Sequence, residues 1–361
     1  MISSAIVPAW RYLLLFRRLL IFTVVALCLT SSGVEAASRI TAQSAVVLDP
    51  VSDHALYAKA PQRLRAPAST TKLLTAMVAI DRLGLDEVVR VPRMVGTVPP
   101  TKVYLRPDER YKVSDLIKAM LMRSANDAAA VLAIATAGTR KSFAELMNEK
   151  ARSIGCKHSN FVRPNGLPAR GQITTAYDMA LISREASNYD FIVETMETKH
   201  ARIQSESGRR IALKNSNRLL WQSKYHVLGK TGFTKRARHC FVGMVESRDG
   251  FLFVSVLGSQ SRMSLWRDIR QIVRLRLDGL KKTIMTNNKL WPTSTDRQTI
   301  QANLQKIGFD VGPLDGVFGI KTISAIRAFQ SSVDLPVDGI VGEKTLRALV
   351  SELSTDDSQH I

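Results

Sequence analysis

The sequence predicts an α/β fold in which an antiparallel sheet is flanked by helices. Apolar segments of strand length occur near both ends of the region 44–257, and the segments between them carry apolar residues at helical spacing. A single sheet that joins the first and last strands would bury both under shared helices. A short pattern that occurs twice near the C-terminus predicts a second, smaller domain.

The elements of the first domain can be predicted in order along the chain. A β-hairpin is expected over 44–58, around a turn at 49–53 that contains Asp, Pro and Ser. A helix is expected to begin at Ser69, and the segment 114–137 reads as one long helix or as two shorter ones interrupted near Ser124. The last elements are helices at 143–154 and 176–186, a hairpin at 241–257 with Asp249-Gly250 in its turn, and a basic amphipathic helix at 264–280.

The second domain is predicted from an internal repeat. Residues 281–295 include Asn-Asn and Pro-Thr-Ser-Thr, which predict a linker. After it, the run DGVFGIKTISAI from Asp315 matches the run DGIVGEKTLRAL from Asp338 at an offset of 23 residues. Each copy is a glycine-containing turn that leads into a helix, and a unit this small is more typical of a binding module than of an enzyme. We expect this domain at 296–352, followed by a disordered polar tail at 353–361.

The composition excludes several classes of protein. The chain has 361 residues, which predicts two or three domains, and its 45% hydrophobic and 23% charged residues are typical of soluble globular proteins. A polytopic membrane protein, a collagen-like fibre and a wholly disordered chain are therefore excluded. The net charge of +20 divides into +2 for 1–36, +21 for 37–295 (42 basic and 21 acidic residues) and −3 for 296–361. This excess predicts an anionic partner such as nucleic acid, acidic lipid or an anionic polymer.

Residues 1–36 have the pattern of a secretory signal peptide. Arginines 11, 17 and 18 precede the apolar run 19–29, and Val34-x-Ala36 has the small residues of a cleavage site. The run is short for a membrane span. The alternative is an uncleaved anchor that also uses residues 12–16, at the cost of placing two arginines in lipid. We expect secretion across the inner membrane, into the periplasm or the cell wall.

Cleavage at this point would leave two cysteines, Cys156 and Cys240. They could form one disulfide bridge, but buried free thiols are the ordinary expectation for so few cysteines. Cys156-Lys-His158 would suggest a thiol enzyme only if the two side chains met in space, and a structural cysteine is the expected case. No group of His, Cys, Asp and Glu has metal-ligand spacing, so no metal or other cofactor is expected.

Ser69-Thr-Thr-Lys72 can supply a nucleophile and its base. Residues three apart on a helix share a face, so the hydroxyl and the amine can lie within hydrogen-bond reach. A serine becomes nucleophilic when a neighbouring base takes its proton, and a lysine can do so if burial or another cation lowers its pKa. Taken singly, Ser69 could equally be a helix cap and Lys72 a solvated side chain.

Two later segments can complete such a site. Ser124-Ala-Asn126, in the expected helix break, offers a hydroxyl for proton relay and an amide for holding Lys72 and a substrate carbonyl. Lys230-Thr-Gly232, on an expected strand, offers positive potential, hydroxyls for a carboxylate and close access to the backbone. Each segment alone is weak evidence. In this order, the three form the signature shared by penicillin-binding proteins and class A β-lactamases.

Five runs between residues 40 and 280 resemble the low-molecular-mass penicillin-binding proteins that are serine-type D-Ala-D-Ala carboxypeptidases. They are 67–77 (PASTTKLLTAM), 121–129 (LMRSANDAA), 164–167 (PNGL), 215–219 (NSNRL) and 229–234 (GKTGFT). The resemblance implies a penicillin-binding-protein/β-lactamase-like transpeptidase fold for a catalytic domain at 37–280. It also implies roles for single residues. Ser69 would be acylated, Lys72 would be the general base, and Ser124 and Asn126 would line the cleft. Lys230, Thr231 and Thr234 would hold the terminal carboxylate beside Gly232, and the N–H groups of Ser69 and Phe233 would form the oxyanion hole.

The sequence departs from this family in two places. Ala125 stands where relatives often have Gly, and the repeat module replaces the β-rich domain and amphipathic anchoring helix that follow the catalytic domain in several relatives. Membrane attachment of that type is therefore not expected. The module is similar to the three-helix peptidoglycan-binding domain in the segments 308–310, Asp315-Gly, Phe329-Gln330 and 335–339. A helical linker module without a ligand is the alternative.

Other functions fit the sequence less well. A class A β-lactamase needs a glutamate for deacylation, and none occurs between Glu149 and Glu185. A non-catalytic wall-binding protein would not need the intact Ser69 and Lys72, and no nucleic-acid motif accompanies the positive charge. The sequence thus predicts an exported D,D-carboxypeptidase that removes the terminal D-Ala of peptidoglycan pentapeptides and is acylated by penicillins and other β-lactams. Peptidoglycan is also the expected ligand of the tail domain, and the charge fits association with the wall or a membrane surface.

Overall fold

The computed structural model describes residues 40–48, 55–222, 226–247, 250–286, 294–316, 318, 320–337, 339, 341 and 343–356. Several predicted features lie outside the described residues. They are the signal segment 1–36 with Cys28, the hairpin turn at 49–53, Asp249 in the second turn, the middle of the linker and the end of the tail.

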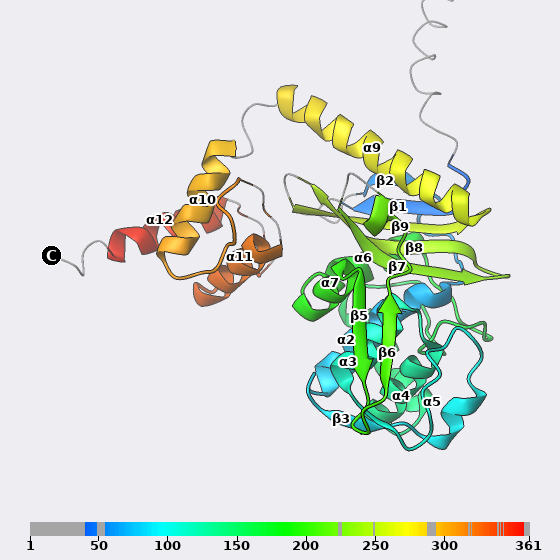
Figure 1. Ribbon diagram of the computed structural model, residues 1–361. Helices are drawn as coiled ribbons and strands as arrows, with labels where there is room; N and C mark the ends of the chain where they lie inside the picture. The colour runs from blue at the N-terminus through cyan, green and yellow to red at the C-terminus, as the bar shows by residue number, and fades with distance from the viewer. Residues whose placement is uncertain are drawn as a thin grey trace, which may run out of the picture. The chain divides into compact units, whose positions relative to one another are not determined.

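The predicted α/β fold is confirmed by a five-stranded antiparallel sheet with the order β2-β1-β9-β8-β7 (Figure 1). Strand β1 pairs with β9 along its whole length, with Ala45 opposite Val256, so the first and last strands are joined as expected. Both predicted hairpins are present, as β1–β2 and β8–β9. The strands are β1 (Ser44–Leu48), β2 (Ala55–Lys59), β7 (Val227–Thr234), β8 (Arg238–Ser247) and β9 (Gly250–Ser259).

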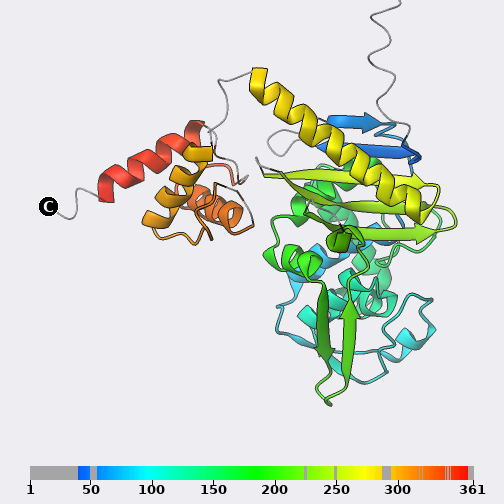
Figure 2. The same cartoon turned by 45° about the horizontal axis from the view of Figure 1, so that its top comes forward.

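Helices pack on both faces of this sheet. Helix α6 (Ala176–Ala186) contacts β1, β8 and β9 on one face, and α9 (Arg262–Thr286) crosses β8 and β9 on the other (Figures 1 and 2). The carboxylate of Asp268 in α9 accepts hydrogen bonds from the backbone N–H groups of Thr41 and Ala42, each at 2.9 Å, and from the Ser259 hydroxyl. This buried carboxylate therefore ties the helix to the start of β1 and the end of β9.

A helical layer beyond α6 carries two of the three predicted site segments, while the third lies on β7. Helix α4 (Asn126–Ala137) is apolar around its circumference, and all its residues from Asn126 to Ala133 are buried, as expected for a helix at the centre of a layer. The break expected near Ser124 is real, because α3 (Val113–Met122) ends before it and α4 begins after it. The remaining helices of this layer are η1 (Ala68–Thr71), α2 (Lys72–Arg82), η2 (Arg93–Thr97), α5 (Arg140–Ser153) and α7 (Asp190–Glu197).

Two small sheets and one short helix complete this part of the chain. Strands β3 (Val88–Arg90) and β4 (Arg110–Lys112) form one antiparallel pair, and β5 (His200–Gln204) and β6 (Arg210–Lys214) form the long hairpin seen in Figure 1. The short helix is α8 (Leu219–Gln222). Within the described residues, no helix is both long enough and apolar enough to cross a bilayer.

The C-terminal module consists of α10 (Ser294–Lys306), α11 (Ile320–Ser332) and α12 (Glu343–Asp356), as the predicted three-helix domain requires. The two copies of the repeat are stabilised in the same way. For each copy, a buried glutamine from the helix before it accepts a hydrogen bond from a repeat glycine N–H and donates one to a repeat threonine hydroxyl. The bonded sets are Gln301 with Gly316 (2.7 Å) and Thr322 (3.1 Å), and Gln330 with Gly339 (2.8 Å) and Thr345 (3.2 Å).

Two predicted boundaries need correction. Helix α9 continues to Thr286 and α10 begins at Ser294, so both ends of the range 281–295 are helical rather than linker. Helix α12 continues to Asp356, so the first residues of the range 353–361 are helical rather than disordered. Residues such as Lys, Met and Leu have good helix propensity, so a helix can continue past the point at which a sequence pattern ends.

Candidate active site

The proposed nucleophile lies in a tight turn at the start of a buried helix. Ser69 belongs to η1, and its neighbour Ala68 has φ +50°, in the left-handed region. The Thr70 hydroxyl donates to the carbonyl of Pro67 at 2.6 Å and stabilises the turn. Because Lys72 is the first residue of α2, its side chain returns to the Ser69 hydroxyl, with Nζ 2.9 Å from Oγ. The predicted Ser-x-x-Lys pair is therefore formed.

The amine of Lys72 is buried and surrounded by oxygen atoms. Besides Ser69 Oγ, its Nζ lies 2.7 Å from Asn126 Oδ1 and 2.7 Å from the backbone carbonyl oxygen of Asn165. Burial lowers its pKa well below the usual value, and the charge of Lys230 lowers it further, while Asp127 opposes the shift. A neutral amine has two hydrogens, which the two amide carbonyls accept. Its lone pair is then left to face the hydroxyl of Ser69.

The segment 123–127 forms one wall of the site. Ser124 has φ +61° in the break between α3 and α4, which places it beside Ser69 in a cleft of about 340 Å³. The Asn126 side chain is 2% exposed, and its Nδ2 donates to the carbonyl oxygens of Pro99 (3.1 Å) and Pro100 (2.9 Å). Asn126 thus joins Lys72 to the loop that borders the cleft.

Strand β7 forms the opposite wall. Lys230 is 1% exposed, its Nζ donates to the Thr231 carbonyl at 2.8 Å, and burial lowers its pKa to about 7. Thr231, Gly232 and Phe233 line the cleft with Ser69, and a Cβ added to Gly232 would lie 2.9 Å from the backbone nitrogen of Ser69. Glycine therefore allows β7 to approach the nucleophile closely.

Thr234 is placed differently from its neighbours. Its hydroxyl accepts a hydrogen bond from the backbone N–H of Ala237 at 3.0 Å, in the turn between β7 and β8, and it is not among the residues that line the cleft. Lys72, Asn126 and Lys230 also lie behind the cleft surface, because they are buried. The structure thus brings together eight of the nine predicted residues around one centre and places Thr234 at its edge.

Several residues of the site were not predicted from the sequence. The carbonyl of Asn165 holds Lys72, and although the run 164–167 resembles the family, a backbone oxygen has no residue-type signal. His239 lies opposite Phe233 across the β7–β8 pair, with ring centroids 4.4 Å apart, so the register of this hairpin could have identified it. The other residues of the cleft lining are Thr101, Arg123, Ser216, Arg262, Leu265 and Trp266.

The cleft has excess positive charge. Arg123 and Arg262 line it in addition to the lysines behind it, and burial together with Arg262 lowers the pKa of His239. Carboxylates are absent from its lining among the described residues. Such a cleft favours an anionic ligand, for instance a peptide that ends in a free carboxylate.

The cysteines do not form a second active site. Cys156 and Cys240 are buried and unpaired with each other, and burial raises the pKa of both thiols, which therefore stay protonated. Cys156 Sγ contacts the carbonyl oxygen of Asp178 at 3.5 Å, while His158 uses its backbone N–H to contact the Asp178 carboxylate. Both residues have structural roles here, as expected for buried thiols.

Comparison with known proteins identifies the family. Residues 31–261 match the family described as D-alanyl-D-alanine carboxypeptidase, and this match covers more than half of the chain. The chain belongs to the D-alanyl-D-alanine carboxypeptidase family. Residues 293–349 match a second family, described as a peptidoglycan binding domain. The predicted resemblance to a D-Ala-D-Ala carboxypeptidase followed by a peptidoglycan-binding domain is therefore confirmed.

Curated relatives are similar over the catalytic part of the chain. D-alanyl-D-alanine carboxypeptidase DacF of Bacillus subtilis is 28% identical over 228 residues, which are 61% of this chain and 58% of the relative. The D-alanyl-D-alanine endopeptidase of Escherichia coli is 34% identical over 210 residues, or 56% of this chain and 67% of the relative. The chain thus spans less than two thirds of the length of the DacF relative.

Solved structures confirm the penicillin-binding-protein fold. Penicillin binding protein 6B of Escherichia coli is 31% identical, with a TM-score of 0.60 over 66% of this chain and 77% of that one. A D-alanyl-D-alanine carboxypeptidase of Mycobacterium tuberculosis is 26% identical, with a TM-score of 0.62 over 66% of this chain and 91% of that one. Members of the serine peptidase family thus share the sheet and helical layer described above.

Proposed function

We propose that this protein is a serine D,D-carboxypeptidase that removes the terminal D-Ala of peptidoglycan pentapeptides through an acyl-enzyme. The observation that carries the proposal is the environment of Lys72. Its buried amine faces the Ser69 hydroxyl at 2.9 Å, while two amide carbonyls take up its hydrogens. A base whose pKa is lowered by burial and which lies beside a hydroxyl is what acylation of a serine requires.

In this mechanism, Ser69 Oγ attacks the carbonyl carbon between the two D-Ala residues, and Lys72 Nζ takes the hydroxyl proton. The oxyanion is stabilised by the backbone N–H groups of Ser69 and Phe233. Collapse of the tetrahedral intermediate breaks the C–N bond, and the leaving D-Ala nitrogen takes a proton, relayed through Ser124 or Lys72. A water molecule then attacks the ester, returns the Ser69 hydroxyl and releases the shortened peptide.

The other residues bind and orient the substrate. The charge of Lys230 and the Thr231 hydroxyl hold the carboxylate of the terminal D-Ala, with Thr234 at the edge of this subsite. Gly232 leaves space for the peptide beside the backbone of β7, and Asn126 orients both Lys72 and the substrate carbonyl. The positive cleft lining supports a substrate with a free C-terminal carboxylate.

Incubation with a pentapeptide tests this function directly. The native protein is expected to produce the tetrapeptide and free D-Ala, both detected by mass spectrometry, and Ser69→Ala is expected to abolish release. Fluorescent penicillin should label native protein covalently and leave Ser69→Ala unlabelled. Equal release from both proteins would exclude Ser69 as the nucleophile, and no release from native protein would exclude the reaction.

Relatives named D-alanyl-D-alanine endopeptidase make a second substrate worth testing. A cross-linked peptide dimer should therefore be included beside the pentapeptide. If the dimer is cleaved faster, the endopeptidase reaction is the main activity. The same acylation steps would apply to both, because only the leaving group differs.

We further propose that the protein acts outside the cytoplasm, with the C-terminal module holding it on peptidoglycan. The match of 293–349 to a peptidoglycan binding domain and the signal-like segment 1–36 support this proposal. Deletion of 296–361 should weaken co-sedimentation with purified sacculi and leave pentapeptide hydrolysis intact. N-terminal sequencing of protein from the cell envelope should begin at Ala37, whereas retention of Met1 would indicate an anchor.

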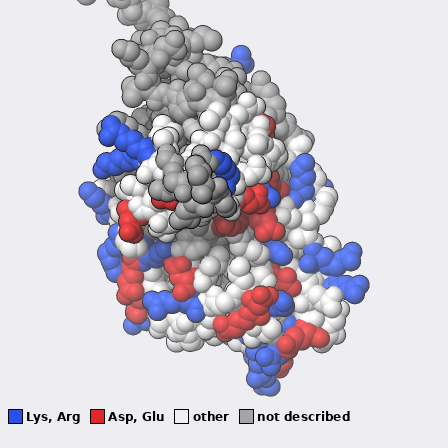
Figure 3. All heavy atoms as spheres, turned by 90° about the vertical axis from the view of Figure 1, so that its left-hand side faces the viewer, with Lys and Arg blue, Asp and Glu red and all other residues white. Residues whose placement is uncertain are grey.

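Charge would contribute to association with the wall or a membrane surface. On the face seen in Figure 3, basic and acidic side chains are interspersed, so the positive excess is not gathered into one patch there. Binding to sacculi that depends on charge should weaken as salt is raised, because screening shortens the range of such attraction. Binding that does not respond to salt would instead indicate contacts of the C-terminal module alone.

A further inference from the structure

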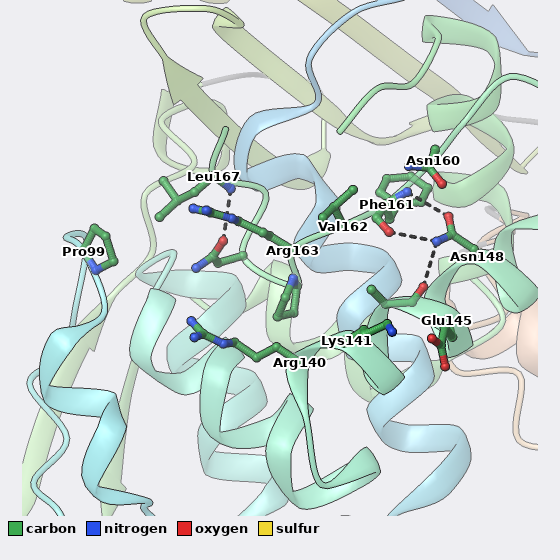
Figure 4. A pocket seen from close by; sticks show the side chains of 13 residues that line it. Pro99, Arg140, Lys141, Glu145, Asn148, Asn160, Phe161, Val162, Arg163 and Leu167 are labelled. Atoms are coloured by element: carbon green, nitrogen blue, oxygen red, sulfur yellow. Dashed lines mark hydrogen bonds between the residues drawn. The ribbon is translucent and has the colours of Figure 1, made fainter. Parts of the chain in front are cut away.

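A second cavity lies behind the catalytic cleft. It has a volume of about 430 Å³, which is within the range of small-molecule sites, and lies between residues 140–148 of α5 and the segment 160–167 (Figure 4). We call it the α5 pocket. The function described above makes no use of it.

The α5 pocket is lined by more cations than carboxylates. Arg140, Lys141 and Arg163 face one acidic side chain, that of Glu145. Figure 4 shows the side chains of Arg140 and Arg163 extending in the same direction, toward Pro99. Within the described part of the chain, none of the three cations forms a salt bridge, so their charge is left for a ligand. Two guanidinium groups of this kind favour carboxylates.

This pocket and the catalytic site share a wall. The carbonyl of Asn165, which lines the pocket, accepts a hydrogen bond from Lys72 Nζ at 2.7 Å. The carbonyl of Pro99, also in the lining, accepts one from Asn126 Nδ2 at 3.1 Å. The pocket therefore lies directly behind groups that hold the proposed base.

The two cavities also approach each other at the surface. Pro99 lines the α5 pocket and Thr101 lines the catalytic cleft, two positions further along the chain. Two residues of extended chain span at most about 7 Å. A peptide in the cleft could therefore reach the pocket with only a few of its own residues.

We propose that the α5 pocket binds the free carboxylates of a peptidoglycan stem peptide whose D-Ala end lies in the catalytic cleft. This inference rests on the proposed function and adds a determinant of substrate choice. The lining combines guanidinium and amide groups with apolar side chains such as Val162 and Leu167, which suits an acidic peptide better than a bare phosphate. The enzyme would then prefer stems with free carboxylates over stems in which those groups are amidated.

Two matched pentapeptides test the proposal. In one peptide, the carboxylates of the glutamate and of the other side chains are free, and in the other peptide these carboxylates are amidated. The carboxylate of the terminal D-Ala is free in both peptides. Native protein should show a KM that is about three- to tenfold lower for the free peptide, because each exposed charge pair adds only a modest attraction. The double variant Arg140→Gln/Arg163→Gln should lose this preference without a change in kcat or KM for the amidated peptide.

Two single variants sharpen the result. Arg152→Gln removes an exposed charge from the same helix, outside the pocket, and should keep the native preference. Glu145→Gln removes the one carboxylate of the lining and should lower KM for the free peptide. Melting temperatures within about 2 °C of native would show that the variants are folded.

The outcomes separate the pocket from the proposed function. Equal KM values of native protein for the two peptides would overturn the inference. An equal rise in KM for both peptides in the double variant would also overturn it. If native protein hydrolyses neither peptide, the proposed function fails, and calorimetric titration of the free and amidated peptides then decides on the pocket. A preference for inorganic phosphate as competitor over acetate would assign the pocket to phosphate-bearing polymers instead and overturn the peptide assignment.

Discussion

Replacing Gly232 by alanine tests the close approach of β7 to Ser69, the proposed nucleophile. The added Cβ would lie 2.9 Å from the Ser69 nitrogen and 3.1 Å from the Ala68 Cβ, whereas ordinary contacts begin at 3.4 Å. The strand and the turn must therefore separate by about 0.5 Å, the difference between 2.9 and 3.4 Å. A misplacement of about 1 Å can cost about 10²-fold in rate, so a tenfold loss is expected from half that shift.

The assay is the second-order rate of acylation by a fluorescent penicillin, measured with the melting temperature of the same samples. Acylation by Gly232→Ala should fall about tenfold or more, because the Ser69 N–H is also a proposed oxyanion donor. Overpacking costs about 1–3 kcal/mol, so the melting temperature should fall by only a few degrees. Gly84→Ala is the control, since a Cβ there has no neighbour within 4 Å, and it should change neither quantity. Native acylation in Gly232→Ala would refute the role given to this contact.

Three further predictions concern the base, the turn and a distant histidine. The pKa of Lys72 is well below its usual value, and its neutral amine is the proposed base. Acylation should therefore decline as pH falls through that lowered pKa, and Lys72→Arg should be inactive in a stopped-flow pH series. Gly166 has φ +75°, and an alanine there would place its Cβ against the carbonyl of Ala68. Calorimetry should therefore show that Gly166→Ala has a melting temperature several degrees lower than native. The hydrogen bond to Glu246 raises the pKa of His226, so its stabilising effect is full below the usual histidine pKa and is lost as pH rises through the raised one. Urea unfolding of His226→Gln should therefore differ from native most at pH 5.5 and least at pH 8.5, and an equal difference at both would contradict the assignment.

Much of the fold could be predicted because local signals agreed with the global arrangement. The apolar hairpin segments at both ends have strand composition, and the bounds of α6 match the predicted range 176–186. Ser124 marked the break between α3 and α4. The ends of α9 and α12 had no stop signal in the sequence beyond periodicity at α9 and polar composition at α12, and both helices continue further than predicted.

The candidate site likewise contains residues that the sequence could predict and groups that it could not. Side chains with characteristic spacing, such as Ser69 with Lys72, could be recognised before the structure was known. Groups that act through the backbone could not, because the carbonyl of Asn165 or of Pro99 is present in every residue type. Arg140 and Arg163 also escaped prediction, since their positions 23 residues apart gave no pattern until folding brought both to one pocket.

The pairing of β1 with β9 has a consequence for how the protein reaches its active form. These strands lie about 200 positions apart in the chain, and the walls of the cleft come from η1, the α3–α4 break and β7. Closing such a loop costs conformational entropy before its contacts form, which slows folding. A chain released before β9 would leave the edge of β1 that pairs with it unpaired, and unpaired strand edges are prone to aggregation. Synthesis through the last strand is thus a condition for assembling the cleft around Ser69.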